Sequence, residues 1–125
     1  MFSDAHCDTI SRILDAGQDL YENDGHVDYR RLKRQVSQIQ FYAAWIDPKY
    51  EPGGCLTRCL DIIDKFYIEC EKNQIPVITK PQDVDGGGAV LSVEGGSALC
   101  GRLSALRMLH KLGVRALTLT WNGRN

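Results

Sequence analysis

The sequence predicts an α/β fold built on a parallel sheet. Short apolar runs alternate with segments in which apolar residues recur every three or four positions. The resulting order is strand, helix, strand, helix, strand, helix, strand, which is typical of parallel strands joined by crossover helices. A doubly wound open sheet and a (β/α)8 barrel both fit this order. A third observation is that polar side chains stand at the ends of the apolar runs, where such folds carry their functional residues.

The amino-terminal segments predict a strand followed by a helix. Residues 1–6 contain few turn-forming side chains and are expected to form the first strand. Residues 9–17 place isoleucine and leucine side chains at helical spacing, and a glycine ends the pattern. The acids, asparagine and glycine that mix over residues 18–27 predict a polar loop.

A short helix and a buried strand come next. Asp28 is a suitable N-cap, and Leu32 and Val36 fall on one face of the helix expected after it. The arginines and lysines of this segment fall on the other faces, and we interpret them as a solvated helix surface. Residues 39–46 are nearly all apolar and are followed by turn-forming residues, which predicts a strand buried on both faces.

The remaining segments continue the alternation. The clearest amphipathic pattern spans residues 55–72 and predicts a long helix. A short strand is expected over 75–79, a buried strand over 89–94, a helix over 97–112 and a last strand over 114–121. The helix before the last strand is expected to bury four leucines, which are Leu99, Leu103, Leu106 and Leu109.

Composition excludes several classes of function. The 125 residues are 43% hydrophobic and 25% charged, which is ordinary for a globular domain, and 15 basic against 16 acidic side chains leave a net charge of −1. Such a balance gives no long-range attraction for nucleic acid or an anionic membrane. The five cysteines are odd in number and sparse, so we interpret them as reduced thiols. With no apolar segment typical of a signal peptide or a membrane span, a cytoplasmic location is expected.

Polar residues follow three of the expected strands. His6 and Asp8 end the first strand, Glu94 ends the third, and Trp121 and Asn122 end the fourth. The carboxyl ends of parallel strands meet at one edge of a sheet, so these side chains are expected to lie together.

The first of these groups has the composition of a partial metal site. Side chains two apart on a strand share a face, so His6 and Asp8 can supply an imidazole nitrogen and a carboxylate oxygen to the same zinc ion. The alternative is a histidine that is simply hydrogen-bonded to a neighbouring acid. Glu94 ends an apolar run and precedes two glycines, so its carboxylate faces either water or a cation. Its alternative interpretation is a charge that favours the amino terminus of the next helix.

Other candidate motifs are weaker. The sequence DGGGA over residues 85–89 lacks the lysine and hydroxyl residue of a phosphate-binding loop and precedes a strand. His110 falls in the last turn of an expected helix, where the helix dipole favours it, and His26 falls in the polar loop. No serine stands in an arrangement typical of a nucleophile and its base.

Four segments resemble one known family in their order and approximate spacing. They are DAHCDTI, QIQFYAAWI, LSVEGG and LSALRMLHKLGVRALTLTWN. Together they are similar to the membrane (renal) dipeptidase family, peptidase family M19, and their spelling is closer to the bacterial, soluble members than to the lipid-anchored animal enzymes. The resemblance extends over essentially the whole chain.

The resemblance implies a (β/α)8 TIM barrel of the metal-dependent hydrolase type, with two zinc ions at the carboxyl ends of its strands. His6 and Asp8 would then bind one zinc ion and Glu94 would bridge both. The implied reaction is the hydrolysis of dipeptides by a hydroxide held between the metals, with tolerance for a D-residue at the carboxyl-terminal position. Animal members have a histidine that contacts substrate where this sequence has Trp121. Trp121 and Asn122 are therefore expected to line the substrate pocket. The alternative for Trp121 is a plain packing role in the fold.

A complete barrel of this kind needs roughly 200 residues or more. The 125 residues supply about four strand-helix units, so residues 1–125 are expected to be a single partial domain, the amino-terminal half of a barrel. Two zinc-binding histidines and a late catalytic aspartate of the family have no counterpart here, so no catalytic side chain is assigned and the chain alone is expected to be inactive.

Two alternatives concern how such a half-barrel is used. Its open sheet edges would allow two copies to associate as a homo-oligomer. The incomplete ligand set also makes a non-catalytic scaffold or assembly domain, which retains part of the dipeptidase fold, the rival interpretation from a different functional class.

Overall fold

A computed structural model of the protein describes residues 2–35 and 38–122. Four parallel strands form one sheet in the order β1-β2-β3-β4, so each strand lies beside its neighbours in sequence. The strands are β1 (Phe2–Asp4), β2 (Gln38–Trp45), β3 (Gly88–Glu94) and β4 (Val114–Thr118). The predicted α/β class with a parallel sheet is confirmed.

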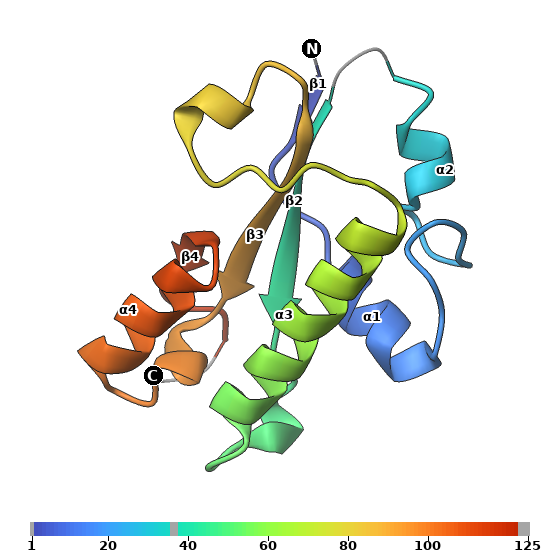
Figure 1. Ribbon diagram of the computed structural model, residues 1–125. Coiled ribbons are helices and arrows are strands. Elements are labelled where there is room, and N and C mark those ends of the chain that lie inside the picture. The colour runs from blue at the N-terminus through green and yellow to red at the C-terminus, as the bar shows by residue number, and fades with distance from the viewer. Residues whose placement is uncertain (1, 36–37, 123–125) are drawn as a thin grey trace.

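The helices lie between the strands in sequence, as predicted. They are α1 (Thr9–Ala16), α2 (Tyr29–Leu32), α3 (Cys55–Lys72) and α4 (Leu103–Lys111), with short 3-10 turns η1 (Pro48–Tyr50), η2 (Pro81–Asp83) and η3 (Gly96–Leu99). In Figure 1, α3 passes in front of the carboxyl-terminal part of β2, with α1 on one side and α4 on the other, and it contacts both β2 and β3. The arrowheads of β2 and β3 point to the same end of the molecule, which is where the candidate site lies.

The core fills the space between the central strands and α3. Tyr42 of β2 and Phe66 of α3 are both almost fully buried, and their rings lie 5.9 Å apart. Residues of β2 alternate as a strand should, so Tyr42 and Ala44 belong to this core while Phe41 and Trp45 lie on the opposite face of the sheet. That opposite face carries the candidate site at its carboxyl edge.

Two side chains of α3 depart from the amphipathic pattern of residues 55–72. Leu60 is exposed although it lies at one of the recurring apolar positions of that pattern. Glu69 is 1% exposed although it is a charged residue between those positions. Its carboxylate accepts the backbone N–H of Leu20 at 2.7 Å and lies 2.7 Å from the Lys65 ammonium, so burial is tolerated because both oxygens have partners.

The helix expected over 97–112 is interrupted. The structure has the short turn η3 and then α4, because Cys100 and Gly101 both adopt positive φ angles, 50° and 65°, which a helix does not accommodate. Of the leucines expected on the buried face, Leu109 is buried and Leu99 is partly buried, whereas Leu103 and Leu106 are exposed, because α4 packs mainly on β4 and η3.

Three smaller predictions have different outcomes. The prediction of a strand over 75–79 is wrong, because only an isolated bridge between Val77 and Ala89 forms there. The short helix after Asp28 is confirmed, and the Asp28 carboxylate accepts the Arg31 N–H as its cap. Val36, expected on the apolar face of that helix, lies outside the described residues.

The length and hydropathy of the helices show whether any of them could span a membrane. In the ranges that the structure describes, no helix combines the length and the apolar character needed to cross a bilayer.

Candidate metal centre

His6 lies just beyond the first strand. The expected strand over 1–6 ends earlier, at Asp4, but the chain stays beside β2: Cys7 donates its N–H to the Phe41 carbonyl at 3.0 Å and accepts the N–H of Ala43 at 2.9 Å. The alternation of a strand therefore continues past the end of β1. Cys7 is buried, and the side chains on either side of it turn to the other face.

Asp8 occupies the N-cap position of α1 without capping it. Its carboxylate accepts no backbone N–H of the helix. Instead its Oδ1 lies 3.2 Å from the Nε2 atom of His6. An aspartate at a helix start usually bonds to the first turn, so this carboxylate is directed away from its ordinary partner and toward the imidazole.

Glu94 completes the cluster from the third strand. Its Oε2 also lies 3.2 Å from His6 Nε2, and its side chain is 14% exposed. The chain turns immediately afterwards: Gly95 has a φ of 89°, which favours glycine, and donates its N–H to Thr118 of β4 at 3.0 Å. The glycine that follows Glu94 is thus required by the backbone turn that ends β3.

The three side chains match the ligand preferences of zinc. One nitrogen and two carboxylate oxygens all lie within 4.8 Å of one another. Two ligand atoms on one tetrahedral zinc ion are about 3.4 Å apart, because zinc bonds to nitrogen and oxygen are about 2.1 Å long. The donor set and its spacing therefore fit a zinc ion after only small side-chain movements.

Electrostatics at the cluster also favour a cation. Burial raises the pKa of the Glu94 carboxyl above its ordinary value, and the charge of Asp8 raises it further, while His6 acts in the opposite direction. Two carboxylates held together repel each other, and either a proton or a metal ion relieves that repulsion. A cation held between the two carboxylates would compensate their charges.

The two residues predicted after the fourth strand reach the same neighbourhood. Trp121 lies edge-to-face with Trp45, with ring centroids 5.5 Å apart and planes at 74°. Trp121 and Glu94 both line a hollow of about 310 Å³ and a second one of about 220 Å³, and Asn122 lines only the second. The structure thus brings Trp121 and Asn122 close to Glu94.

Sequence reasoning missed Trp45. It was assigned only to a buried strand, yet it ends β2 and its Cα is paired in register with that of Glu94. Paired positions on neighbouring strands share a face, so Trp45 stands beside the cluster. The available signal was an aromatic residue at the carboxyl end of a strand, the same signal that singled out Trp121.

The other histidines and the basic run are not part of this centre. Among the residues that the structure describes, His6, Asp8 and Glu94 are the only group of three or more potential ligands whose atoms converge. The basic run has partners of its own in the same region, since Arg30 lies 2.6 Å from Glu22 and Arg31 lies 2.6 Å from Asp28. It is therefore a paired helix surface.

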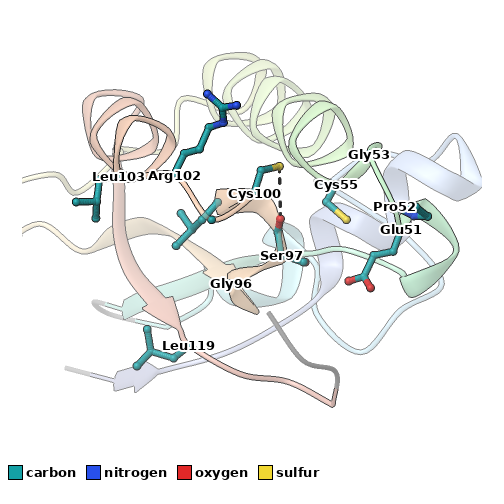
Figure 2. Close-up of a pocket in the computed structure, with 12 residues that line it drawn as sticks. Glu51, Pro52, Gly53, Cys55, Gly96, Ser97, Cys100, Arg102, Leu103 and Leu119 are labelled. Carbon is teal, nitrogen blue, oxygen red and sulfur yellow. Dashed lines mark hydrogen bonds between the residues drawn. The ribbon is translucent and has the colours of Figure 1, made fainter.

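A larger hollow of about 610 Å³ lies apart from the cluster, between the start of α3 and the turn η3. Figure 2 shows Cys55 and Cys100 near Ser97 in its wall, and the Cys100 thiol donates to the Ser97 carbonyl at 3.7 Å. All five cysteines of the protein are free thiols.

Comparison with known proteins decides the family. The model of the membrane dipeptidases (peptidase family M19) matches residues 1–125. The chain belongs to this family. The resemblance predicted from four sequence segments is therefore confirmed at the level of the family.

Proteins similar to this chain include mammalian proteins named dipeptidase 3. The human protein is 28% identical over 101 residues, which cover 78% of this chain and 21% of the relative, and the mouse protein is 28% identical over 101 residues and 20% of its length. The Macaca fascicularis protein is 28% identical over 95 residues, covering 73% of this chain and 20% of the relative. The chain spans about a fifth of the length of these relatives.

Proposed function

We propose that this M19 protein contributes a zinc centre to the hydrolysis of dipeptides. The observation that carries the proposal is the convergence of His6, Asp8 and Glu94 at the carboxyl edge of a parallel sheet, with His6 Nε2 at 3.2 Å from both carboxylates. An imidazole with two carboxylates is a donor set suited to zinc, and the family is one of dipeptidases.

The roles of the three side chains follow from where they stand. His6 through Nε2, Asp8 through Oδ1 and Glu94 through Oε2 would hold a zinc ion, and the family resemblance gives Glu94 the bridging position between two ions. When bound, zinc lowers the pKa of water and polarises the carbonyl of a scissile bond. Backbone pairing of Cys7 with β2 and the turn at Gly95 would position these side chains for such an ion.

We also propose that the sheet is the amino-terminal part of a (β/α)8 barrel. The order β1-β2-β3-β4 supports this, because a doubly wound sheet reverses direction at a switch point and a barrel does not. Exposed apolar side chains gather on α4 and just past β4, which include Leu103, Met108 and Leu119. Further strand-helix units would cover them in a barrel.

The alternative is a non-catalytic domain that keeps this scaffold for assembly. The number of ligands favours this alternative, because three side chains suffice only for one zinc ion and a single contact to a second. The exposed residues just named would also suit a homo-oligomer. We therefore expect the 125 residues alone not to cleave Gly-D-Phe, and cleavage that is lost in Glu94→Ala would contradict that expectation.

Zinc binding tests the central proposal. The purified protein is titrated with zinc, bound metal is counted after dialysis, and thermal unfolding is followed by circular dichroism. Zinc at about 100 times its dissociation constant should stabilise the fold by about 2.7 kcal/mol. His6→Ala should lose both the bound metal and the rise in Tm, whereas the matched control His110→Ala should keep both. Absence of zinc from the wild-type protein, or an unchanged response in His6→Ala, would refute the metal centre.

A further inference from the structure

We propose that Trp45 and Trp121 form the wall of a side-chain pocket that selects dipeptides with a large apolar or aromatic residue. This inference rests on the proposed function, because it assigns the substrate preference of the same site. It starts from a hollow of about 310 Å³ that Asp8 and Glu94 share with both tryptophans. A volume at the lower limit of ligand pockets suits one amino-acid side chain better than an extended peptide.

Hydrogen bonds to α1 hold the Trp45 side of the wall in position. Trp45 donates its backbone N–H to the Ser11 hydroxyl at 3.2 Å, and the same hydroxyl is within 3.2 Å of the Trp45 carbonyl. Ser11 is itself buried on α1, so the end of β2 is fixed between the sheet and that helix. A prearranged aromatic surface loses little conformational freedom when a ligand binds.

Trp121 supplies the accessible part of the wall. The residue is 43% exposed, so part of its indole is accessible to a ligand. The edge-to-face contact with Trp45 leaves indole surface available to a ligand, and the aromatic pair is a surface against which apolar and aromatic groups pack well. Trp121 also lines the neighbouring hollow of about 220 Å³, so it stands between two small spaces that both border Glu94.

The charged residues of the pocket are already paired. Arg12 lies 2.9 Å from Asp24, and Asp15 lies 2.6 Å from Arg58, which is itself buried. Their charges are therefore compensated within the protein and offer little to an ionic side chain of a substrate. The remaining charges, on Asp8 and Glu94, belong to the candidate metal centre. An uncharged side chain that packs on the indoles is the occupant that this lining favours.

The two tryptophans make the test direct. They are the only tryptophans in the sequence, so tryptophan emission reports on this wall alone. The zinc-treated protein is titrated at millimolar concentration with Gly-Gly, Gly-Phe, Phe-Gly, Gly-Asp and Gly-Lys, and binding is followed by emission and by calorimetry. One of the two phenylalanine dipeptides should bind at least about 10-fold more tightly than Gly-Gly and the charged dipeptides.

Three variants separate the wall from general packing. Trp121→Ala should abolish the preference for phenylalanine, and Trp121→Phe should retain part of it. The control is Leu119→Ala, which removes another exposed apolar side chain from the same segment but lines the larger hollow of Figure 2, and it should bind as wild type does. Zinc-dependent stabilisation is measured for each variant and should not change.

The outcomes distinguish this inference from the metal centre. Equal affinity for Gly-Gly and the phenylalanine dipeptides, a preference that survives in Trp121→Ala, or no binding of any dipeptide would overturn the wall even where zinc binds. Selective binding of a phenylalanine dipeptide by a protein that takes up no zinc would support the wall and contradict the proposed metal centre.

Discussion

Helices α3 and α4 have the same kind of amphipathic sequence but different surroundings. α3 buries eight of its 18 residues, including Phe66, whereas α4 buries two of its nine, Ala105 and Leu109. α3 packs on the two central strands and against α1 and η3, while α4 packs on β4 and η3 at the side of the described sheet. An amphipathic pattern therefore identifies which face of a helix is apolar, and the neighbouring elements determine whether that face is covered.

The largest expected effect is on the buried side of α3. Phe66→Ala removes a ring that contacts Tyr42 and Tyr67 and should lower the free energy of unfolding by about 3–5 kcal/mol. Leu103→Ala on α4, where the side chain is 71% exposed, should change it by less than about 0.5 kcal/mol. Urea unfolding of both variants measures the contrast, and a large loss in Leu103→Ala would show that α4 is covered in solution.

A second test addresses the buried polar contact of α3. Glu69→Gln keeps the shape of the side chain but removes the charge that receives the Leu20 N–H and the Lys65 ammonium. The free energy of unfolding should fall by about 1.5–3 kcal/mol, the usual contribution of a hydrogen bond to a charged group. Glu71→Gln, an exposed position on the same helix, is the control, and equal effects at the two positions would contradict the assigned role.

A third test addresses the cluster of His6, Asp8 and Glu94 at the carboxyl edge of the sheet. The pKa of Glu94 is raised, so its ionised form is unfavourable in the metal-free fold at neutral pH, and this cost disappears as the pH falls through the raised pKa. Glu94→Gln should therefore stabilise the metal-free protein at pH 7 by about 0.5–2 kcal/mol while it weakens zinc binding. The gain should shrink in mildly acidic buffer, and a destabilised variant would argue against repulsion at this site.

The smallest effect concerns thiol reactivity rather than stability. Burial raises the pKa of Cys59 and Cys70 on α3 to about 12 and that of Cys7 to about 11, whereas Cys100, between η3 and α4, is exposed. Because the thiolate is the reactive form, iodoacetamide at pH 8 should modify Cys100 first, as peptide mass spectrometry would show. Rapid labelling of Cys59 in the native protein would contradict its burial.

The raised pKa values of the same three buried thiols also predict that the free energy of unfolding falls in alkaline solution. A pKa that is higher in the folded state means that the protonated thiols support the fold fully below about pH 9, the ordinary value for a thiol. That support is lost as the pH rises through 11 to 12. Unfolding should therefore become easier above pH 9, and a urea midpoint that stays constant from pH 8 to 11 would contradict the shifts.

Much of the fold could be predicted because its signals are local and repeated. The helix expected over 55–72 has those bounds in the structure, since the apolar spacing persists through several turns. The break before α4 could not be predicted, because it depends on a left-handed conformation at Cys100 that non-glycine residues seldom adopt. The exposure of Leu103 depends on which elements lie beside α4, and helical periodicity carries no information about that.

Part of the candidate site could also be predicted from the sequence, and part could not. His6, Asp8 and Glu94 could be placed near one another because parallel strands bring their carboxyl ends to one edge. Whether they bind metal stays a prediction. The same argument could have placed Trp45 at this edge, but its pairing with Glu94 depends on strand register, which is fixed by pairing across the sheet.

The arrangement of the cluster along the chain has a consequence for folding. Two of the three side chains stand near the start of the sequence and the third stands near its last quarter, so most of the chain lies between Asp8 and Glu94. A cation that bridges them would close this long loop, and the entropy lost on closing a loop grows with its length. Because the three ligands meet only in the folded chain, such an ion would be held only after this loop has closed, and it would stabilise the folded state by its binding free energy, whereas a disulfide restricts the unfolded chain.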